Sequence, residues 1–167
     1  MALLSLASQY PSGTARIYVF DSTAPESAQR RYLEDLVRAM PQTTKLARPG
    51  EVGEILAGLG AEMNERGSET ETDAAAPVFL IFHGLQRFAK LRYEEEFAFA
   101  TPDPDAPANP AVVLHDIVSE GARLGFHVLA MVDTYNNVTR FINRKALSEI
   151  GMRVLFQMSA TDSASLI

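Results

Sequence analysis

Four continuous apolar runs, each reached through a segment of helical periodicity, predict a three-layer α/β fold with a mainly parallel sheet and helices on both faces. The runs cover residues 17–20, 78–82, 127–132 and 154–158. Buried parallel strands are apolar on both faces because helices cover both sides of the sheet. The length of 167 residues is ordinary for one domain, so we expect a single domain over residues 1–167.

Apolar residues recur at helical spacing between these runs. We expect helices over 2–9, 26–40, 50–66, 86–96, 112–124 and 136–149. Proline and glycine end the first of them, at Pro11 and Gly13, and Pro41 ends the second. Residues 67–76 and 101–110 are acidic or rich in proline, and we expect them to be mobile loops within the domain.

Composition excludes several classes of protein. Apolar residues make up 47% and charged residues 22%, the usual balance of a soluble globular protein. The absence of cysteine excludes disulfides and thiolate metal sites, and the three histidines are too widely spaced to form a local metal-ligand pattern, so we expect no metal site. No apolar run is long enough to cross a membrane and no signal peptide is recognisable, which predicts a cytoplasmic protein.

The net charge of −6 gives the chain no overall field that would attract nucleic acid. A local contact could still come from basic residues on the segment expected to form the last helix. Arg140, Arg144 and Lys145 are the candidates for contact with nucleic acid. A solvated helix face is the alternative interpretation of these residues.

Polar residues stand where three of the expected strands end, and functional groups gather beyond the carboxyl ends of parallel strands. These residues are Asp21, His83 and Asp133. His83 is a candidate catalytic residue, since histidine can exchange protons near neutral pH, and Asp133 or Asp21 could pair with it. The alternatives are a structural, hydrogen-bonded histidine and two aspartates that form turns or cap helices.

Several motifs in the chain resemble those of the FtsK/SpoIIIE family of DNA-translocating ATPases. They are Gly-Phe-His at 125–127, Arg-Val-Leu-Phe-Gln at 153–157, Ser-Ala-Thr-Asp-Ser at 159–163, Gly-Leu-Gln-Arg-Phe at 84–88 and Leu-Ala-Ser-Gln-Tyr-Pro at 6–11. The resemblance covers nearly the whole chain and implies a P-loop NTPase, RecA-like sheet that lacks its first strand. It implies ATP and Mg²⁺ as cofactors of the full-length family, and DNA as a partner only through the full assembly.

Three departures from the family pattern concern hydrolysis. No G-x-x-x-x-G-K-[ST] sequence is present, and His83 and Gly84 occupy the places of the acidic pair that holds Mg²⁺ and positions water. Val132 and Asp133 replace the usual Thr-Gln pair. We therefore expect no cofactor for this chain alone, no hydrolysis, and a structural, assembly or regulatory role in a larger motor.

Two other functions stay open. The chain could be a nucleotide-binding module whose P-loop lies upstream and whose site a neighbouring subunit completes. It could also be an unrelated flavodoxin-like or hydrolase-like domain that uses Asp21, His83 and Asp133.

The resemblance also implies roles for other residues. Candidates near a nucleotide are Asp21, Asp133, Thr134, Asp162 and Ser163. Arg153 matches a family arginine near subunit boundaries, which suggests an interface role in self-association or in contacts with other modules. Helix caps and turns, or a salt bridge at the start of a strand, are the alternatives for these residues.

The resemblance further implies an order of strands. Residues 17–20, 78–82 and 127–132 should be consecutive neighbours. A place for 17–20 in the middle of the sheet, or for 127–132 at an edge far from 78–82, would overturn the family assignment and every role inferred from it. The strand at 153–157 would lie across a gap one strand wide, about 9.6 Å. It would then slide against 127–132 or pair with another chain.

Overall fold

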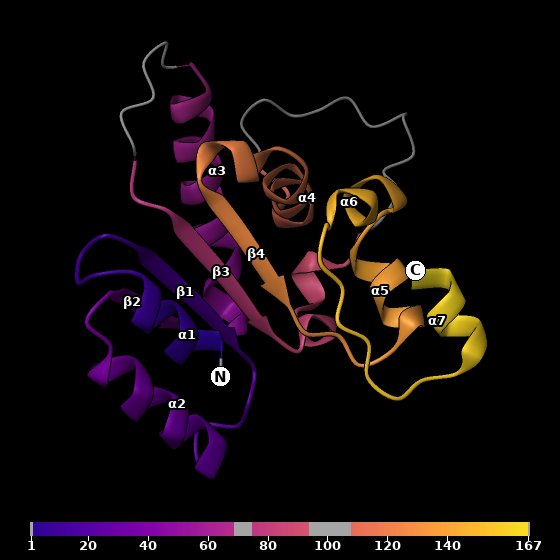
Figure 1. Cartoon of the computed structure of the whole chain (residues 1–167), viewed down its shortest axis with the longest axis horizontal. Helices are drawn as coiled ribbons and strands as arrows, with labels where there is room; N and C mark the ends of the chain where they lie inside the picture. The colour runs from indigo at the N-terminus through magenta and orange to yellow at the C-terminus, as the bar shows by residue number, and fades with distance from the viewer. Residues whose placement is uncertain (1, 69–74, 94–107, 167) are drawn as a thin grey trace.

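A four-stranded, all-parallel sheet forms the centre of the computed structural model, which describes residues 2–68, 75–93 and 108–166 (Figure 1). The strands are β1 (Arg16–Asp21), β2 (Thr43–Ala47), β3 (Val78–His83) and β4 (Phe126–Ala130). Their order across the sheet is β2-β1-β3-β4. With helices packed on both faces, this sheet confirms the predicted three-layer α/β fold.

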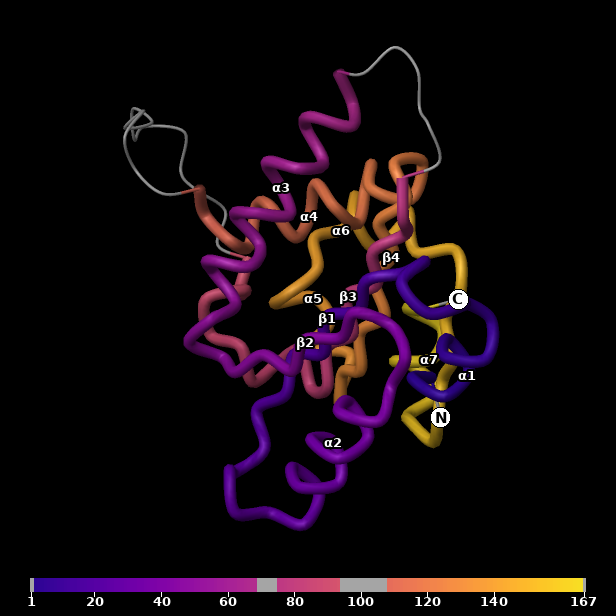
Figure 2. Tube along the Cα trace, turned by 90° about the vertical axis from the view of Figure 1, so that its left-hand side faces the viewer, coloured from indigo at the N-terminus to yellow at the C-terminus, as the bar shows by residue number. Residues whose placement is uncertain are grey.

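Helices cover the two faces of the sheet unequally. One face packs against α3 (Val52–Ser68), α4 (Pro110–Glu120), α5 (Tyr135–Phe141) and α6 (Arg144–Glu149). The other packs against α1 (Ala2–Gln9) and α2 (Ala28–Ala39). Seen from the β2 side, α3 and α4 lie on one side of the strands and α1 on the other (Figure 2). Alternate residues of β1 and β3 enter the two apolar layers, which explains why both strands are apolar throughout.

Stacked aromatic rings fill the core near the carboxyl ends of β1 and β3. The rings of Phe20 and Phe82 are stacked with centroids 4.4 Å apart, and Phe88 meets both rings edge-on at 6.3 and 5.8 Å. All three side chains are buried. This cluster gives the ends of the two central strands a rigid base.

Two predicted helices are wrong in detail. The helix predicted over 136–149 is broken at Asn143, whose side chain accepts a hydrogen bond from the Ala146 amide at 2.7 Å and so starts α6. The helix predicted over 86–96 is replaced by the 3₁₀ turns Leu85–Arg87 and Ala89–Leu91. Gly84, with φ of +77°, turns the chain sharply out of β3 and prevents a regular helix start. Residues 94–96 lie outside the described residues.

The predicted strands need two corrections. The strand predicted at 154–158 is absent, because these residues form no regular structure, bend at Gln157 and do not pair with the sheet. Residues 43–47 form β2 instead, an edge strand whose partly exposed pattern carries only two apolar residues, Leu46 and Ala47. The number of strands is therefore as predicted, although one of them is different.

The strand order partly agrees with the order that the family resemblance implied. Strands β1, β3 and β4, at the predicted 17–20, 78–82 and 127–132, are consecutive neighbours as expected. However, β1 is an interior strand because β2 pairs with its outer side. The prediction that 17–20 is not inside the sheet is therefore wrong, and this is the outcome named above as evidence against the family assignment. Residues 153–157 do not pair with the 127–132 strand, so that outcome is wrong, while the other predicted outcome, pairing with another chain, stays a prediction.

The predicted loops fall mostly outside the described residues. Residues 67 and 68 belong to the end of α3, while 69–74 and 101–107 are among those that the structure does not describe. Within the described parts of the chain, no helix is both long enough and apolar enough to cross a membrane.

Candidate functional site

The direction in which the sheet grows reverses between β1 and β3. After β1 the chain crosses one face of the sheet through α2 and adds β2 on one side of β1. It then crosses the opposite face through α3 and adds β3 on the other side of β1. In open parallel sheets, ligands bind outside the carboxyl ends of the strands at such a switch point. Asp21 and His83 are the last residues of β1 and β3 and stand opposite each other in register. Sequence reasoning had chosen both as candidates.

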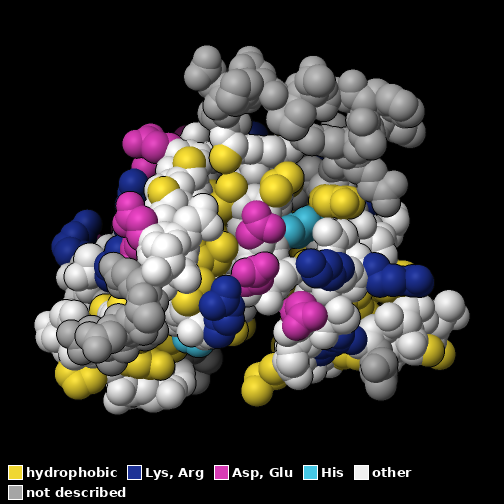
Figure 3. All heavy atoms as spheres, turned by 90° about the horizontal axis from the view of Figure 1, so that it is seen from above, with side chains coloured by type: hydrophobic (Ala, Val, Ile, Leu, Met, Phe, Trp, Pro, Cys, Tyr) yellow, Lys and Arg dark blue, Asp and Glu magenta, His cyan; other side chains and the backbone are white. Residues whose placement is uncertain are grey.

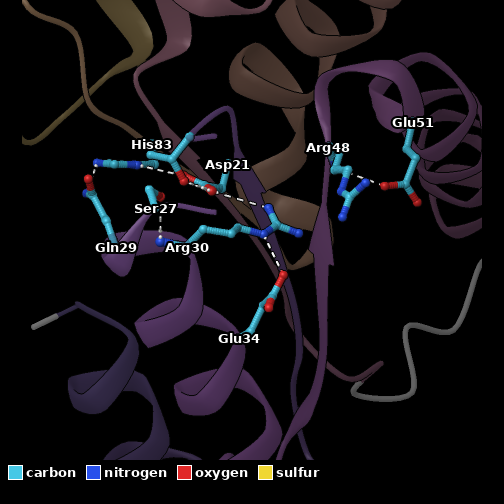
Figure 4. Close-up of polar contacts among 9 residues, drawn as sticks. Asp21, Ser27, Gln29, Arg30, Glu34, Arg48, Glu51 and His83 are labelled. Atoms are coloured by element: carbon cyan, nitrogen blue, oxygen red, sulfur yellow. Dashed lines mark hydrogen bonds and ion pairs between the residues drawn. The ribbon is translucent and has the colours of Figure 1, made fainter. Parts of the chain in front are cut away.

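Asp21 is the most fully bonded polar residue at this switch point. Its carboxylate accepts hydrogen bonds from His83 Nδ1 at 2.9 Å, from Arg30 Nη1 at 3.2 Å and from the Thr23 hydroxyl at 2.5 Å (Figure 4). The side chain is entirely buried. Burial alone would raise the pKa of Asp21, but the hydrogen bonds from Thr23, His83 and Arg30 outweigh it and lower the pKa below its ordinary value.

Arg30 supplies the charge that balances Asp21. It lies in the first turn of α2, which Ser27 caps. The Ser27 hydroxyl accepts a hydrogen bond from the Arg30 amide at 3.0 Å. The guanidinium, 5% exposed, also donates from Nε to Glu34 at 2.8 Å. Burial lowers the pKa of Arg30, but the bonds to Glu34 and Asp21 outweigh that effect and raise it. Asp21 and Arg30 therefore form a buried ion pair, and both oxygens of Asp21 accept hydrogen bonds.

His83 is partly accessible, with 29% of its side chain exposed. Because Nδ1 donates to Asp21, Nε2 is the acceptor of the neutral ring, and it lies 3.2 Å from Gln29 Nε2, which donates to it. Figure 4 shows Gln29 and Asp21 on opposite sides of the imidazole. Both ring nitrogens thus have a protein partner.

The contacts limit what this site can do chemically. A metal ion at Asp21 would have to displace the Arg30 guanidinium, since Thr23, His83 and Arg30 already occupy the two oxygens. No group of three or more potential ligands for a metal ion occurs among the described residues. An aspartate that orients a histidine is an arrangement used in acid–base catalysis, but here Gln29 covers the outer nitrogen.

Asp133 and Thr134 do not join this cluster. Asp133 accepts from Asn137 Nδ2 at 2.7 Å, and this bond is the main reason why its pKa is lowered. The Thr134 hydroxyl accepts from the Asn137 amide at 3.2 Å and caps α5. Among the described residues, no hydrogen bond or ion pair links Asp133 to His83 or Asp21. The capping interpretation therefore accounts for both residues.

Arg153, Asp162 and Ser163 lie together at the C-terminal end of the described chain, away from the switch point. Arg153 donates to the Leu166 carbonyl at 2.6 Å and to the Leu147 carbonyl at 2.7 Å, so it joins the ends of α6 and α7 (Ala160–Leu166). Asp162 is in the first turn of α7, where its amide donates to the Ser159 hydroxyl. A hollow of about 340 Å³ lies here, lined by Ile150, Gly151, Arg153, Leu155 and Leu166.

Arg140, Arg144 and Lys145 are exposed on α5 and α6. No ion pair holds any of the three to another described residue. On the face seen in Figure 3, basic and acidic side chains are interspersed, and no uniform basic field forms there. These features agree with the interpretation as a solvated surface.

Sequence reasoning missed Arg30, Thr23 and Gln29. The signal for Arg30 was its helical spacing of three and seven residues from Leu33 and Val37, which places it on the buried face of α2. A charged residue on such a face needs a partner, and Asp21 is the nearby candidate. Thr23 and Gln29 gave no comparable signal.

Neither the protein-family models nor the curated proteins with which the chain was compared match it.

Proposed function

We propose that this chain is a non-hydrolysing module of an FtsK/SpoIIIE-type DNA-translocating ATPase, with a structural, assembly or regulatory role. One observation carries the proposal. At the carboxyl end of β3, where a hydrolysing member has its acidic pair, the chain has His83 and Gly84, and His83 is tied to a carboxylate that Arg30 neutralises. Asp21 therefore does not replace the missing acidic residues as a ligand for Mg²⁺.

Two further features support the proposal. The relative order of β1, β3 and β4 is the one that the resemblance implies, although β2 pairs with β1 and so puts β1 inside the sheet, which counts against the family. The family motifs at 153–157 and 159–163 lie in the segment after α6, where Arg153 joins two helix ends. Other modules of the motor are the proposed partners, and DNA would be reached through the full assembly. The proposed location is cytoplasmic.

Topology alone does not separate this proposal from the third candidate. The order β2-β1-β3-β4 is also the beginning of a flavodoxin-like sheet, whose ligand site lies at the switch between β1 and β3. The observation that favours this candidate is the Asp21–His83 pair at that switch. On this alternative the histidine would bind an anionic ligand or act as an acid or base.

Titration calorimetry of the full chain with ATP and Mg²⁺ tests the main proposal. We expect no one-site isotherm with a dissociation constant of roughly 10 μM or tighter, about −7 kcal/mol. The same titration with excess EDTA is the control for heat that does not depend on metal. A saturable, EDTA-sensitive isotherm would show that the chain binds nucleotide.

The alternative predicts a different result with inorganic phosphate as the probe. If the switch point takes an anion, phosphate should shift the NMR signals of the His83 ring in a saturable way, and His83→Gln should abolish the effect on its neighbours. If the His83 signals do not move up to millimolar phosphate, the alternative is wrong and the Asp21–His83 pair has a structural role.

A further inference from the structure

His115 is a buried titratable residue of α4 that lies outside the switch point, and it is 6% exposed. Both of its ring nitrogens have partners beyond α4. Nε2 lies 3.0 Å from the Phe141 carbonyl oxygen, and Nδ1 lies 3.2 Å from Asn143 Nδ2. Phe141 is the last residue of α5, and Asn143 is the N-cap of α6. One imidazole therefore joins α4 to the end of one helix and to the start of the next (Figure 1).

The bonds around Asn143 fix the state of this ring. The Ala146 amide can only donate, so the side-chain oxygen of Asn143 is the group that accepts from it at 2.7 Å. The nitrogen of the same side chain then faces His115, and since it can only donate, Nδ1 must accept. The Phe141 carbonyl can only accept, so Nε2 carries the proton and donates to it. These contacts require a neutral ring with its proton on Nε2.

A second proton on the ring would set two donors against each other. With Nδ1 protonated, its N–H group would point at the amino group of Asn143, 3.2 Å away. Turning the Asn143 side chain over would offer its oxygen to the ring but withdraw that oxygen from the Ala146 amide. The bond to the Phe141 carbonyl would survive, because Nε2 stays a donor. Protonation would therefore release the start of α6 and leave the end of α5 attached.

The described residues offer a charged ring no anionic partner. No ion pair or hydrogen bond among them joins His115 to an acidic side chain. The titratable group whose ring meets the imidazole is Tyr93, with centroids 4.7 Å apart. Four charged residues that lie within one position of His115 or of one of its contacts in the sequence are all exposed: Arg92, Asp116, Arg140 and Arg144.

The other elements packed against α4 do not supply an anion either. Glu62 and Arg66 of α3 bond to each other. The remaining charged or titratable residues of these elements are exposed: Glu54, Glu65, Lys90, Arg123, His127, Lys145 and Glu149. A protonated His115 would thus be a buried cation without a counter-charge, which is unfavourable.

Helix α6 depends strongly on its cap. It has six residues, and its buried residue is Ala146, whose amide Asn143 caps. The Leu147 carbonyl of α6 accepts from Arg153, which also donates to the Leu166 carbonyl at the end of α7. Loss of the cap would therefore reach residues 151–158 and α7 through one side chain.

We propose that His115 is a protonation-sensitive latch. With a neutral ring it holds α6 on α4. With a charged ring it releases α6, and with α6 the residues that Arg153 ties to it, while the sheet stays folded. Histidine is the side chain whose charge ordinarily changes between about pH 5 and pH 8, so mild acidification is the expected signal.

Two NMR measurements on the full chain test the latch. The nitrogen-15 signals of the His115 ring at pH 7.5 report which nitrogen carries the proton, and we expect Nε2. Hydrogen exchange at pH 7.5 and pH 5.5 reports the release, with each rate divided by that of an unstructured amide at the same pH. We expect the protection of the Ala146 and Leu147 amides to fall at least tenfold at the lower pH. The protection of the Ile81 amide, inside β3, should not change.

Asn143→Asp should reverse this response. One oxygen of the new carboxylate can accept from the Ala146 amide and the other from a protonated Nδ1, so protection should be kept or increased at pH 5.5. His83→Gln and His127→Gln change the other two histidines of the chain and serve as controls. Both should lose protection at Ala146 as the parent does.

Several outcomes would overturn the proposal. A proton on Nδ1 at pH 7.5 would do so, and so would equal protection of Ala146 at both pH values. A loss of protection in Asn143→Asp as large as in the parent would contradict the role of the facing donors. A loss that extends to Ile81 would mean that the whole domain unfolds. If Asn143→Asp does not fold, the two measurements on the parent decide.

This inference depends on the contacts between α4 and α6 and is independent of hydrolysis. Nucleotide binding in the calorimetric test would overturn the proposed function and leave the latch standing. Failure of the exchange test would overturn the latch and leave the proposed function standing.

Discussion

The switch point between β1 and β3 and the free edge of β4 belong to one sheet, yet their polar and apolar groups are satisfied in different ways. At the switch point Asp21 and Arg30 are buried and bonded to each other and to their neighbours. At the free edge, backbone groups lack partners among the described residues, and Leu129 and Met131 are about half exposed. The comparison teaches that the polar groups at the switch point are satisfied by neighbouring side chains, whereas the outer edge of β4 is left without a partner strand among the described residues.

The largest expected effect contrasts two phenylalanines. Phe82 is buried in the stack with Phe20, and Phe156 is 84% exposed on residues 151–158, the segment after α6 that we call the outer segment. Phe82→Ala should lower the free energy of unfolding by about 3–5 kcal/mol, because a cavity replaces the ring. Phe156→Ala should change it by no more than about 0.5 kcal/mol. Urea denaturation measures both, and a large loss with Phe156→Ala would show that the outer segment belongs to the core of the isolated chain.

Breaking the buried ion pair should cost nearly as much. Arg30→Met leaves the Asp21 carboxylate buried without its cation, and we expect a loss of about 3 kcal/mol in the free energy of unfolding. Adding Asp21→Asn to Arg30→Met removes the stranded charge and should recover a large part of that loss. If the double variant is no more stable than Arg30→Met, charge balance is not what stabilises the switch point.

The pair also predicts a dependence of stability on pH. The pKa of Asp21 is lower in the folded chain than its ordinary value of about 3.9. The stabilisation is therefore fully present above that value and is lost as the pH falls through the folded pKa. Glu62, whose pKa is lowered despite burial by its bonds to Arg16 and Arg66, contributes in the same range.

Asp21→Asn isolates the contribution of Asp21 to this acid sensitivity. Between pH 5 and pH 2, the free energy of unfolding of the variant should fall less than that of the parent, while the remaining acidic groups act in both proteins. Equal slopes in urea denaturation across this range would mean that Asp21 is not stabilised by its partners.

The smallest expected effect concerns DNA. With a net charge of −6, the chain should bind duplex DNA only weakly, with a salt slope near zero. Gel-shift titrations over a range of salt concentrations measure it. Tight binding at physiological salt that is weakened by Arg140→Ala with Arg144→Ala would make these helices a nucleic-acid surface.

The sequence predicted the fold class and most elements because buried parallel strands and amphipathic helices leave strong periodic patterns. It failed where the pattern depends on neighbours. Thr43–Ala47 has too few apolar residues to stand out, yet it pairs with β1, and 154–158 is apolar yet has no strand to pair with. A run of apolar residues predicts burial, but only the rest of the structure decides whether a neighbouring strand exists.

The candidate site was half predictable for a similar reason. Asp21 and His83 were found because strand ends in a parallel sheet converge, and their register brings them within 2.9 Å. Asp133 was grouped with them, but its side chain accepts a hydrogen bond from Asn137 in α5. Arg30 was omitted, although its guanidinium neutralises Asp21. Side-chain direction, which decides both cases, is not encoded in the spacing of strand ends.

Phosphate release from ATP in the presence of Mg²⁺ tests most directly the central proposal that this chain does not hydrolyse nucleotide. It should be measured for the parent and for the variant His83→Asp with Gly84→Glu, which restores the acidic pair. We predict no turnover above background for either protein, because the P-loop sequence is absent from the chain and Val132 and Asp133 also depart from the family pattern. Turnover by the parent, or its appearance in the variant, would contradict the account.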